Sequence, residues 1–112
     1  MAEHGDQPCE VWPKVFVGNL KHSKNEQLLF KLDITHIIAV GDFDESFPFN
    51  FEYLIFDDVL DTEDNNIMKY FDKCGPFIEE GREVGGVLIH WYVRYLYFEK
   101  LLRSAFLKQK EK

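Results

Sequence analysis

Four short apolar runs alternate with two longer segments of helical periodicity along this chain of 112 residues. The runs are rich in β-branched and aromatic residues and end at glycine or polar residues, which is typical of strands. The densest run, ITHIIAV, is apolar at almost every position, as expected for a strand covered on both faces of a sheet. The pattern therefore predicts strands at 15–17, 34–40, 53–56 and 87–90.

Two segments between these strands have apolar residues three and four positions apart, which places them on one face of a helix. The first segment covers 24–32 and the second covers 67–81. Pro76 lies inside the second segment and predicts a kink, and Gly81 is a residue type favoured just beyond a helix end. Strands that alternate with helices predict an α/β fold, with a mostly parallel sheet flanked by helices.

The composition is that of one small globular domain, with 46% hydrophobic, 16% aromatic and 29% charged residues. The formal net charge of −7 argues against nucleic-acid binding, which needs an excess of Lys and Arg. The acidic N-terminus and the shortness of every apolar run predict neither a secretory signal nor a transmembrane segment. Cys9 and Cys74 are too few for a disulfide scaffold, so a cytoplasmic or nuclear location is expected.

The charge of the chain changes at the end of the fourth predicted strand. Residues 1–90 hold seven Lys/Arg and 18 Asp/Glu, whereas residues 91–112 hold six Lys/Arg and two Asp/Glu. We therefore expect a flexible tail at 1–10, a domain at 11–90, and a divergent basic amphipathic helix at 91–112. This helix either packs back on the open face of the sheet, or binds a membrane surface, a calmodulin-like groove or an acidic partner, or self-associates. Its apolar face would be formed by Trp91, Tyr95, Phe98, Leu102 and Phe106.

Four segments carry motifs in a consistent order: WPKVFVGN at 12–19, LDITHIIAV at 32–40, YFDKCGPFI at 70–78 and GGVLIH at 85–90. The second is close to the strand motif L-G-I-T-H-I-L-N-V of the dual-specificity protein phosphatases. The others are similar to the first strand, the F-x-x-x-x-x-F-I helix and the strand before the catalytic loop of that family. The resemblance covers residues 12–90 and implies the phosphatase-like sheet of the protein-tyrosine phosphatase superfamily.

The resemblance also implies a reaction for which this chain lacks two residues. In the family signature His-Cys-(x)5-Arg, the Cys thiolate attacks phosphorus and the Arg clamps the phosphate oxygens. Here Trp91 follows His90 at the nucleophile position, and Tyr97 occupies the phosphate-clamp position. Asp61 matches the general-acid position, with Asp58 as the fallback, and His90 keeps the loop-orienting position. The sequence therefore predicts a loss of catalysis.

The region around the general-acid position is strongly acidic. Residues 32–68 hold ten Asp/Glu and no Lys or Arg, so their negative field opposes the binding of phosphate groups. The spacing of residues 61–72 faintly resembles a calcium loop, but Asn66 replaces the required Gly and Asp72 the final Glu. We therefore expect a solvated acidic loop, with neither a metal nor an organic cofactor.

These observations predict an inactive, C-terminally incomplete phosphatase-like domain that acts as a binding or competitor module. Its partner would be a phosphoprotein or a protein that binds the active phosphatase. Only 21 residues follow Trp91, which fits an alternative exon, a shifted reading frame or a genuine short gene product. Two alternatives remain: a protein phosphatase whose full-length product is active, and an unstable product without function.

Overall fold

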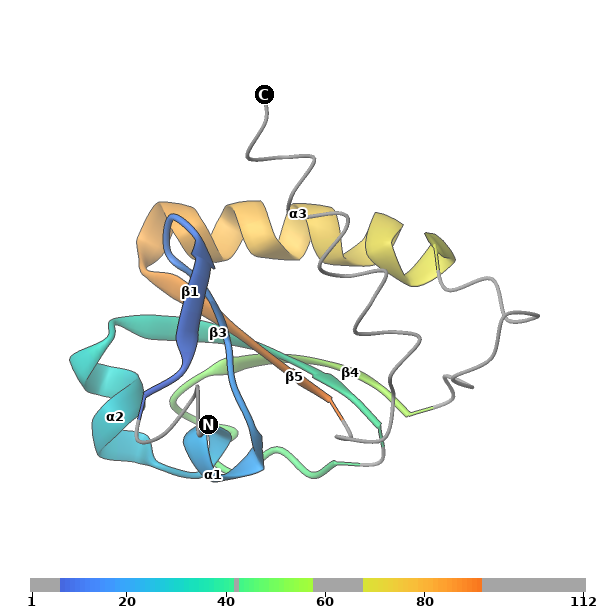
Figure 1. The fold of residues 1–112 in the computed structure, drawn as a ribbon. Helices are drawn as coiled ribbons and strands as arrows, with labels where there is room; N and C mark the ends of the chain where they lie inside the picture. The colour runs from blue at the N-terminus through green and yellow to red at the C-terminus, as the bar shows by residue number, and fades with distance from the viewer. Residues whose placement is uncertain (1–6, 42, 58–67, 92–112) are drawn as a thin grey trace.

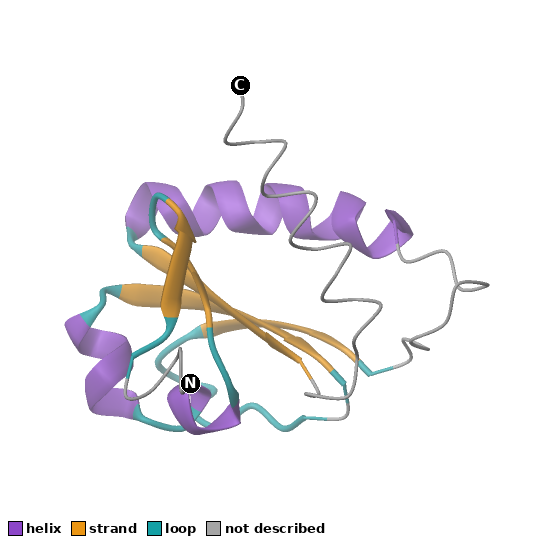
Figure 2. Ribbon diagram, viewed as in Figure 1, coloured by secondary structure: helices purple, strands orange, loops and turns teal. Residues whose placement is uncertain are grey.

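The computed structural model describes residues 7–41, 43–57 and 68–91, which form a three-layer α/β arrangement. A five-stranded sheet lies between one long helix on one face and two short helices on the other (Figure 1; Figure 2). In chain order the elements are β1 (Cys9–Trp12), β2 (Val15–Val17), α1 (Leu20–Ser23), α2 (Glu26–Lys31), β3 (Ile34–Val40), β4 (Glu52–Phe56), α3 (Met68–Val84) and β5 (Gly86–Trp91).

The sheet has the strand order β1-β2-β5-β3-β4. Strand β1 is antiparallel to β2, and all the other neighbours are parallel, so the predicted mostly parallel sheet is confirmed. The central strands β5 and β3 are in register through the pairs Ile38–Ile89 and Ala39–His90. Strand β3 is buried at six of its seven positions, as the unbroken apolar run predicts for a strand covered on both sides.

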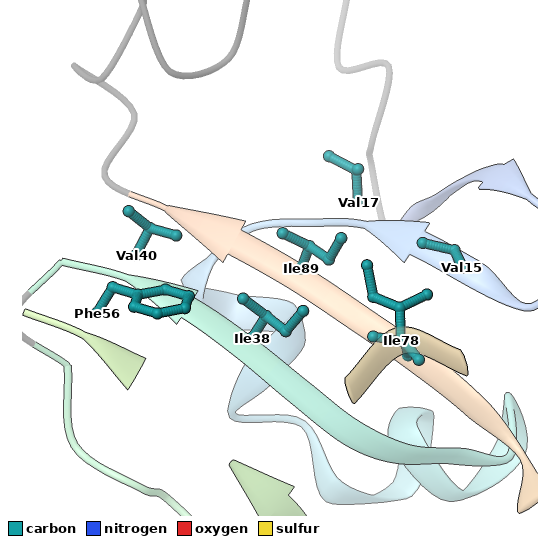
Figure 3. Close-up of a cluster of buried hydrophobic side chains, with 8 residues drawn as sticks. Val15, Val17, Ile38, Val40, Phe56, Ile78 and Ile89 are labelled. Atoms are coloured by element: carbon teal, nitrogen blue, oxygen red, sulfur yellow. The ribbon is translucent and has the colours of Figure 1, made fainter. Parts of the chain in front are cut away.

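Two hydrophobic clusters hold the layers together, one on each face of the sheet. Along β5, Val87 and Ile89 face α3, whereas Leu88 faces the short helices, because successive side chains of a strand alternate between faces. The α3-side cluster, shown in Figure 3, consists of Val15, Val17, Ile38, Val40, Phe56, Ile78, Val87 and Ile89. The opposite cluster consists of Leu29, Ile34, Ile37, Phe51 and Leu88.

Helix α3 is longer than the sequence predicts. The helix continues through Pro76 and ends at Val84, so the expected end at Gly81 is wrong. Gly81 is buried, and a Cβ atom there would lie 2.5 Å from Val87 Cγ2 and 3.0 Å from the His36 ring. The glycine is therefore required by the close approach of α3 to the sheet rather than by a helix end.

The sequence pattern also missed the two shortest elements. Strand β1 begins at Cys9, inside the segment expected to be a tail, and Cys9 pairs with Val17 of β2. Helix α1 has four residues, too few to show a helical period. Asn19, its N-cap residue, and His22, its third residue, form a reciprocal capping box at its N-terminus. Each side chain accepts a hydrogen bond of 3.0 Å from the other residue's backbone N–H.

Substituting the helical glycines tests the close packing of α3. Gly81→Ala should lower the free energy of unfolding by about 1–3 kcal/mol, because the new methyl group must displace Val87 and His36. Gly75→Ala is the matched control, since a Cβ atom at this exposed position meets nothing within 4 Å and should change the stability by less than about 1 kcal/mol. Urea unfolding followed by circular dichroism would measure both, and equal effects would contradict the packing argument.

Candidate functional site

The parallel strands β2, β5, β3 and β4 all end at one edge of the sheet, called here the carboxyl edge. Ligands of open parallel sheets bind at this edge, outside the carboxyl ends of the strands. Gly18 follows β2 there, and its backbone N–H donates to the Ile89 carbonyl oxygen at 3.0 Å. A Cβ atom at Gly18 would lie 2.7 Å from His22 Nδ1, so a glycine allows α1 to start directly against β5.

His90 lies in β5 one residue before its end and is only 3% exposed. Its ring makes an edge-to-face contact with Phe43, with 4.6 Å between the ring centroids. Its Nδ1 atom has no hydrogen-bond partner in the part of the chain that the structure describes. Burial lowers the pKa of His90 to about 4, so the imidazole is neutral at physiological pH. An unpaired buried nitrogen is costly, which makes this position a candidate for function rather than for stability alone.

Trp91 is the last residue of β5 and pairs with Val40 of β3. Its partly buried indole packs against the α3-side cluster, on the same face as Val87 and Ile89 (Figure 3 shows Ile89 and Val40). The position at which the resemblance places a nucleophile is therefore occupied by a packed aromatic side chain. An indole carries neither an ionisable thiol nor an accepting lone pair that could attack phosphorus.

Neither cysteine lies at the end of β5. Cys74 is in α3 and packs against the α3-side cluster, and burial raises the pKa of its thiol to about 12. Cys9 is exposed in β1, beside Val17 of β2. Because β2 separates β1 from β5, Cys9 lies about two strand spacings, roughly 10 Å, from β5.

Several residues singled out in the sequence lie outside the described residues. These are the general-acid candidates Asp58 and Asp61, the phosphate-clamp position Tyr97, and the apolar residues Tyr95, Phe98, Leu102 and Phe106. Asp57 is described and is exposed directly after β4, at the carboxyl edge. Of the site residues predicted from the sequence, the structure therefore places only His90 and Trp91, the last two residues of β5. Their roles as the loop-orienting residue and the replaced nucleophile stay predictions.

Sequence reasoning missed Phe43, which covers the His90 ring, and the Asn19–His22 pair, which lies beside the end of β5. The pair could have been found, because an Asn followed three residues later by a side chain that can accept a hydrogen bond has the spacing of a capping box. The contact between Phe43 and His90 joins residues 47 positions apart, and no local pattern signals it.

In the ranges 7–41, 43–57 and 68–91, no group of three or more His, Cys, Asp and Glu side chains could hold a metal ion. Among the described helices, none combines the length and the apolar character needed to cross a bilayer.

Comparison with known proteins relates this architecture to phosphatases, although no family model matches the chain. The chain is 42% identical over 84 residues to the "MAP kinase phosphatase with leucine-rich repeats protein 3" of Dictyostelium discoideum. The matched region covers 74% of this chain and 10% of that protein. The chain is 35% identical over 88 residues to the "Dual specificity protein phosphatase 1" of Arabidopsis thaliana, covering 77% of this chain and 44% of the relative.

A solved structure supports the same relation. The crystal structure of the human "tyrosine phosphatase-like serine/threonine/tyrosine-interacting protein" matches with a TM-score of 0.65 and 30% identity, covering 73% of this chain and 60% of that one. The chain is therefore a homologue of the dual-specificity protein phosphatases, and its described part has their α/β fold. It spans about a tenth of the Dictyostelium relative and less than half of the Arabidopsis relative.

The buried His90 should make the stability depend on pH. Its pKa is about 4 when folded and 6.5 when exposed, so the unfolded chain binds the proton more tightly. The free energy of unfolding should therefore fall by about 3 kcal/mol as the pH drops from 6.5 to 4, and this loss should be absent in His90→Phe. The measurement is urea unfolding of both proteins at several pH values, and parallel curves for the two would refute the assignment.

The two thiols should differ in reactivity. At pH 8, Cys9 in the Cys74→Ser variant should react readily with Ellman's reagent, because the side chain is exposed. Cys74 in the Cys9→Ser variant should react only after unfolding, because its raised pKa of about 12 keeps the packed thiol protonated. Fast labelling of native Cys74 would show that the thiol is accessible and that this account of α3 is incorrect.

Proposed function

We propose that this chain is a pseudophosphatase, that is, a catalytically inactive phosphatase-like domain that acts by binding. The observation that carries the proposal is the packing of Trp91 at the end of β5, immediately after His90. In the reaction that the family resemblance implies, a thiolate forms an S–P bond while the P–O bond to the substrate breaks. A general acid then protonates the departing oxygen. With Trp91 in place, the first of these bonds has no atom to form it.

The other residues of this chain do not supply a substitute. Cys74 belongs to α3, where its thiol is protonated and packs against the α3-side cluster. Cys9 belongs to β1, and β2 lies between β1 and β5. Tyr97 at the clamp position has no positive charge, whereas an Arg there would bind two phosphate oxygens at once. The buried Nδ1 of His90 finds no hydrogen-bond partner among the described residues, which agrees with a strand end that lacks a complete catalytic loop.

A binding role also agrees with the charge of the chain. The acidic character of residues 32–68 disfavours capture of phosphate groups, so the partner is recognised through protein surface. The name of the similar human structure describes a phosphatase-like protein that interacts with others, which supports this proposal. We infer that the chain competes for a phosphoprotein or for a partner of an active phosphatase, in the cytoplasm or nucleus.

The second candidate function is hydrolysis of phosphoproteins by a longer product. This is favoured by the printed phosphatase names of the relatives and by the fraction of their length that this chain spans. Asp61 at the general-acid position would serve such an enzyme, if a Cys-(x)5-Arg loop were encoded downstream of the His90 codon. Genomic sequence at that point separates the two candidates directly.

The activity of the purified chain tests the proposal. We expect no release of p-nitrophenol from p-nitrophenyl phosphate above the rate without protein, together with a cooperative thermal unfolding transition. The rate of p-nitrophenol release should be the same for the wild type, Cys9→Ser and Asp61→Asn. Cys9 does not lie at the end of β5, and Asp61 has no nucleophile there to assist.

Two results would contradict the proposal. Turnover that disappears in Asp61→Asn or in Cys9→Ser would show that an unconventional set of residues catalyses hydrolysis. A non-cooperative melt with exposed apolar surface would instead indicate an unstable product without function. Cooperative unfolding without turnover is the outcome that supports a binding domain.

A further inference from the structure

The amino ends of the parallel strands form a second surface, on the edge of the sheet opposite to His90 and Trp91. Two open cavities of about 450 and 360 Å³ lie there, where β2, β3, β4 and β5 begin. They adjoin, because Thr35, Asn50 and Val84 line both. We call this combined groove the amino-edge surface.

The amino-edge surface gathers most of the exposed apolar side chains. Four large hydrophobic residues are exposed in the described part of the chain, and three of them line these cavities. Phe49 is 99% exposed, Val84 is 66% exposed and Phe30 is 53% exposed, while the fourth, Leu20, lies elsewhere in α1. Scattered exposed apolar residues are ordinary, but three around one groove mark an interaction surface.

The surface is also acidic. Five carboxylates line the two cavities against a single lysine, Lys14. Among these five carboxylates, only Glu80 contacts a histidine: it accepts a hydrogen bond of 2.9 Å from His36 Nε2. The other ring nitrogen of His36, Nδ1, lies 2.8 Å from Thr35 Oγ1. Carboxylates gathered around a hollow with low-dielectric walls create a negative potential that attracts cations. The carboxylates are Glu10, Asp33, Glu52, Glu80 and Glu83.

The floor of the surface is already ordered. Phe30 stacks on the buried Phe51 with 5.3 Å between ring centroids, and Asn50 donates a hydrogen bond of 2.5 Å to Glu26 of α2. These contacts hold residues 50 and 51, which directly follow Phe49, against α2. A preformed surface loses little conformational entropy when a partner binds, which favours affinity from a short segment.

We propose that the amino-edge surface docks an extended segment of a partner protein that carries an apolar anchor flanked by Lys or Arg. The anchor packs against Phe49 and Val84, and the basic residues face the carboxylates around the groove. This inference deepens the proposed function and rests on it, since it assigns the binding surface of the pseudophosphatase. Because the groove lies at the opposite edge of the sheet, a docked partner leaves the carboxyl edge open.

Peptide selection tests the proposal without knowledge of the partner. A phage-displayed library of random short peptides is panned against the immobilised full chain, with counter-selection against the empty support. We expect the enriched peptides to carry net positive charge and at least one large apolar residue. Synthetic copies of the best peptides are then titrated by fluorescence anisotropy against the wild type and the variants below, at low and high salt.

Two matched pairs of variants make the result specific. Phe49→Ser should raise the peptide Kd about tenfold or more, whereas Leu20→Ser, which removes an exposed apolar residue from α1, should leave it unchanged. Glu83→Lys should raise the Kd about threefold or more and weaken its salt dependence. Asp44→Lys makes the same charge change at an exposed position that lines neither cavity, so it should have little effect. Cooperative unfolding of each variant confirms that it folds.

Three outcomes would overturn the proposal: no enriched peptide, enriched peptides that are acidic, or peptides that bind Phe49→Ser as tightly as the wild type. Self-association of the wild type that is lost in Phe49→Ser, measured by analytical ultracentrifugation, would also overturn it by assigning the surface to a second copy. The phosphatase assay is independent of all these readouts. Peptide binding can therefore fail while the chain remains inactive, and turnover can appear while peptides still bind.

Discussion

The burial of β5 on both faces is the constraint on which the rest of this structure depends. The strand lies between β2 and β3 in the centre of the sheet, so each of its side chains must enter one of two packed layers. Val87 and Ile89 enter the layer under α3, and Leu88 enters the layer beside α2. The same alternation carries Trp91 into the α3 layer. The position to which the sequence resemblance assigns a nucleophile is here taken by a partly buried side chain that packs against the hydrophobic core.

This constraint separates fold from chemistry in the chain. The sheet, its crossovers and the fit of Gly81 against Val87 depend on apolar volume and on backbone approach, and none of them requires a thiolate. Loss of a nucleophile can therefore leave the α/β framework intact, since a fold supports function only through the residues of its site. At the end of β5, the buried Nδ1 atom of His90 has no hydrogen-bond partner among the described residues.

The two edges of the sheet have different character. The carboxyl edge presents His90, buried and neutral, next to the packed Trp91. The amino edge presents exposed Phe49 and Val84 among carboxylates. A solvent-exposed apolar groove among carboxylates is a feature that the proposed binding role explains and that catalysis at the opposite edge would not require. The apolar exposure lowers solubility unless a partner covers it.

The sequence by itself determined the α/β class and the bounds of β2 and β3. The assignment of Trp91 to the nucleophile position also comes from the sequence alone, through the family resemblance, and stays a prediction. Apolar periodicity and a sequence motif are local, so they can be read along the chain. Only the tertiary structure decided that α3 passes Gly81, that β1 adds an antiparallel edge from Cys9, and that Phe43 covers His90. It also gathered Phe30, Phe49 and Val84 around one groove from three separate segments. These features depend on contacts between residues distant in the chain, where the packing distance between layers outweighs local preference.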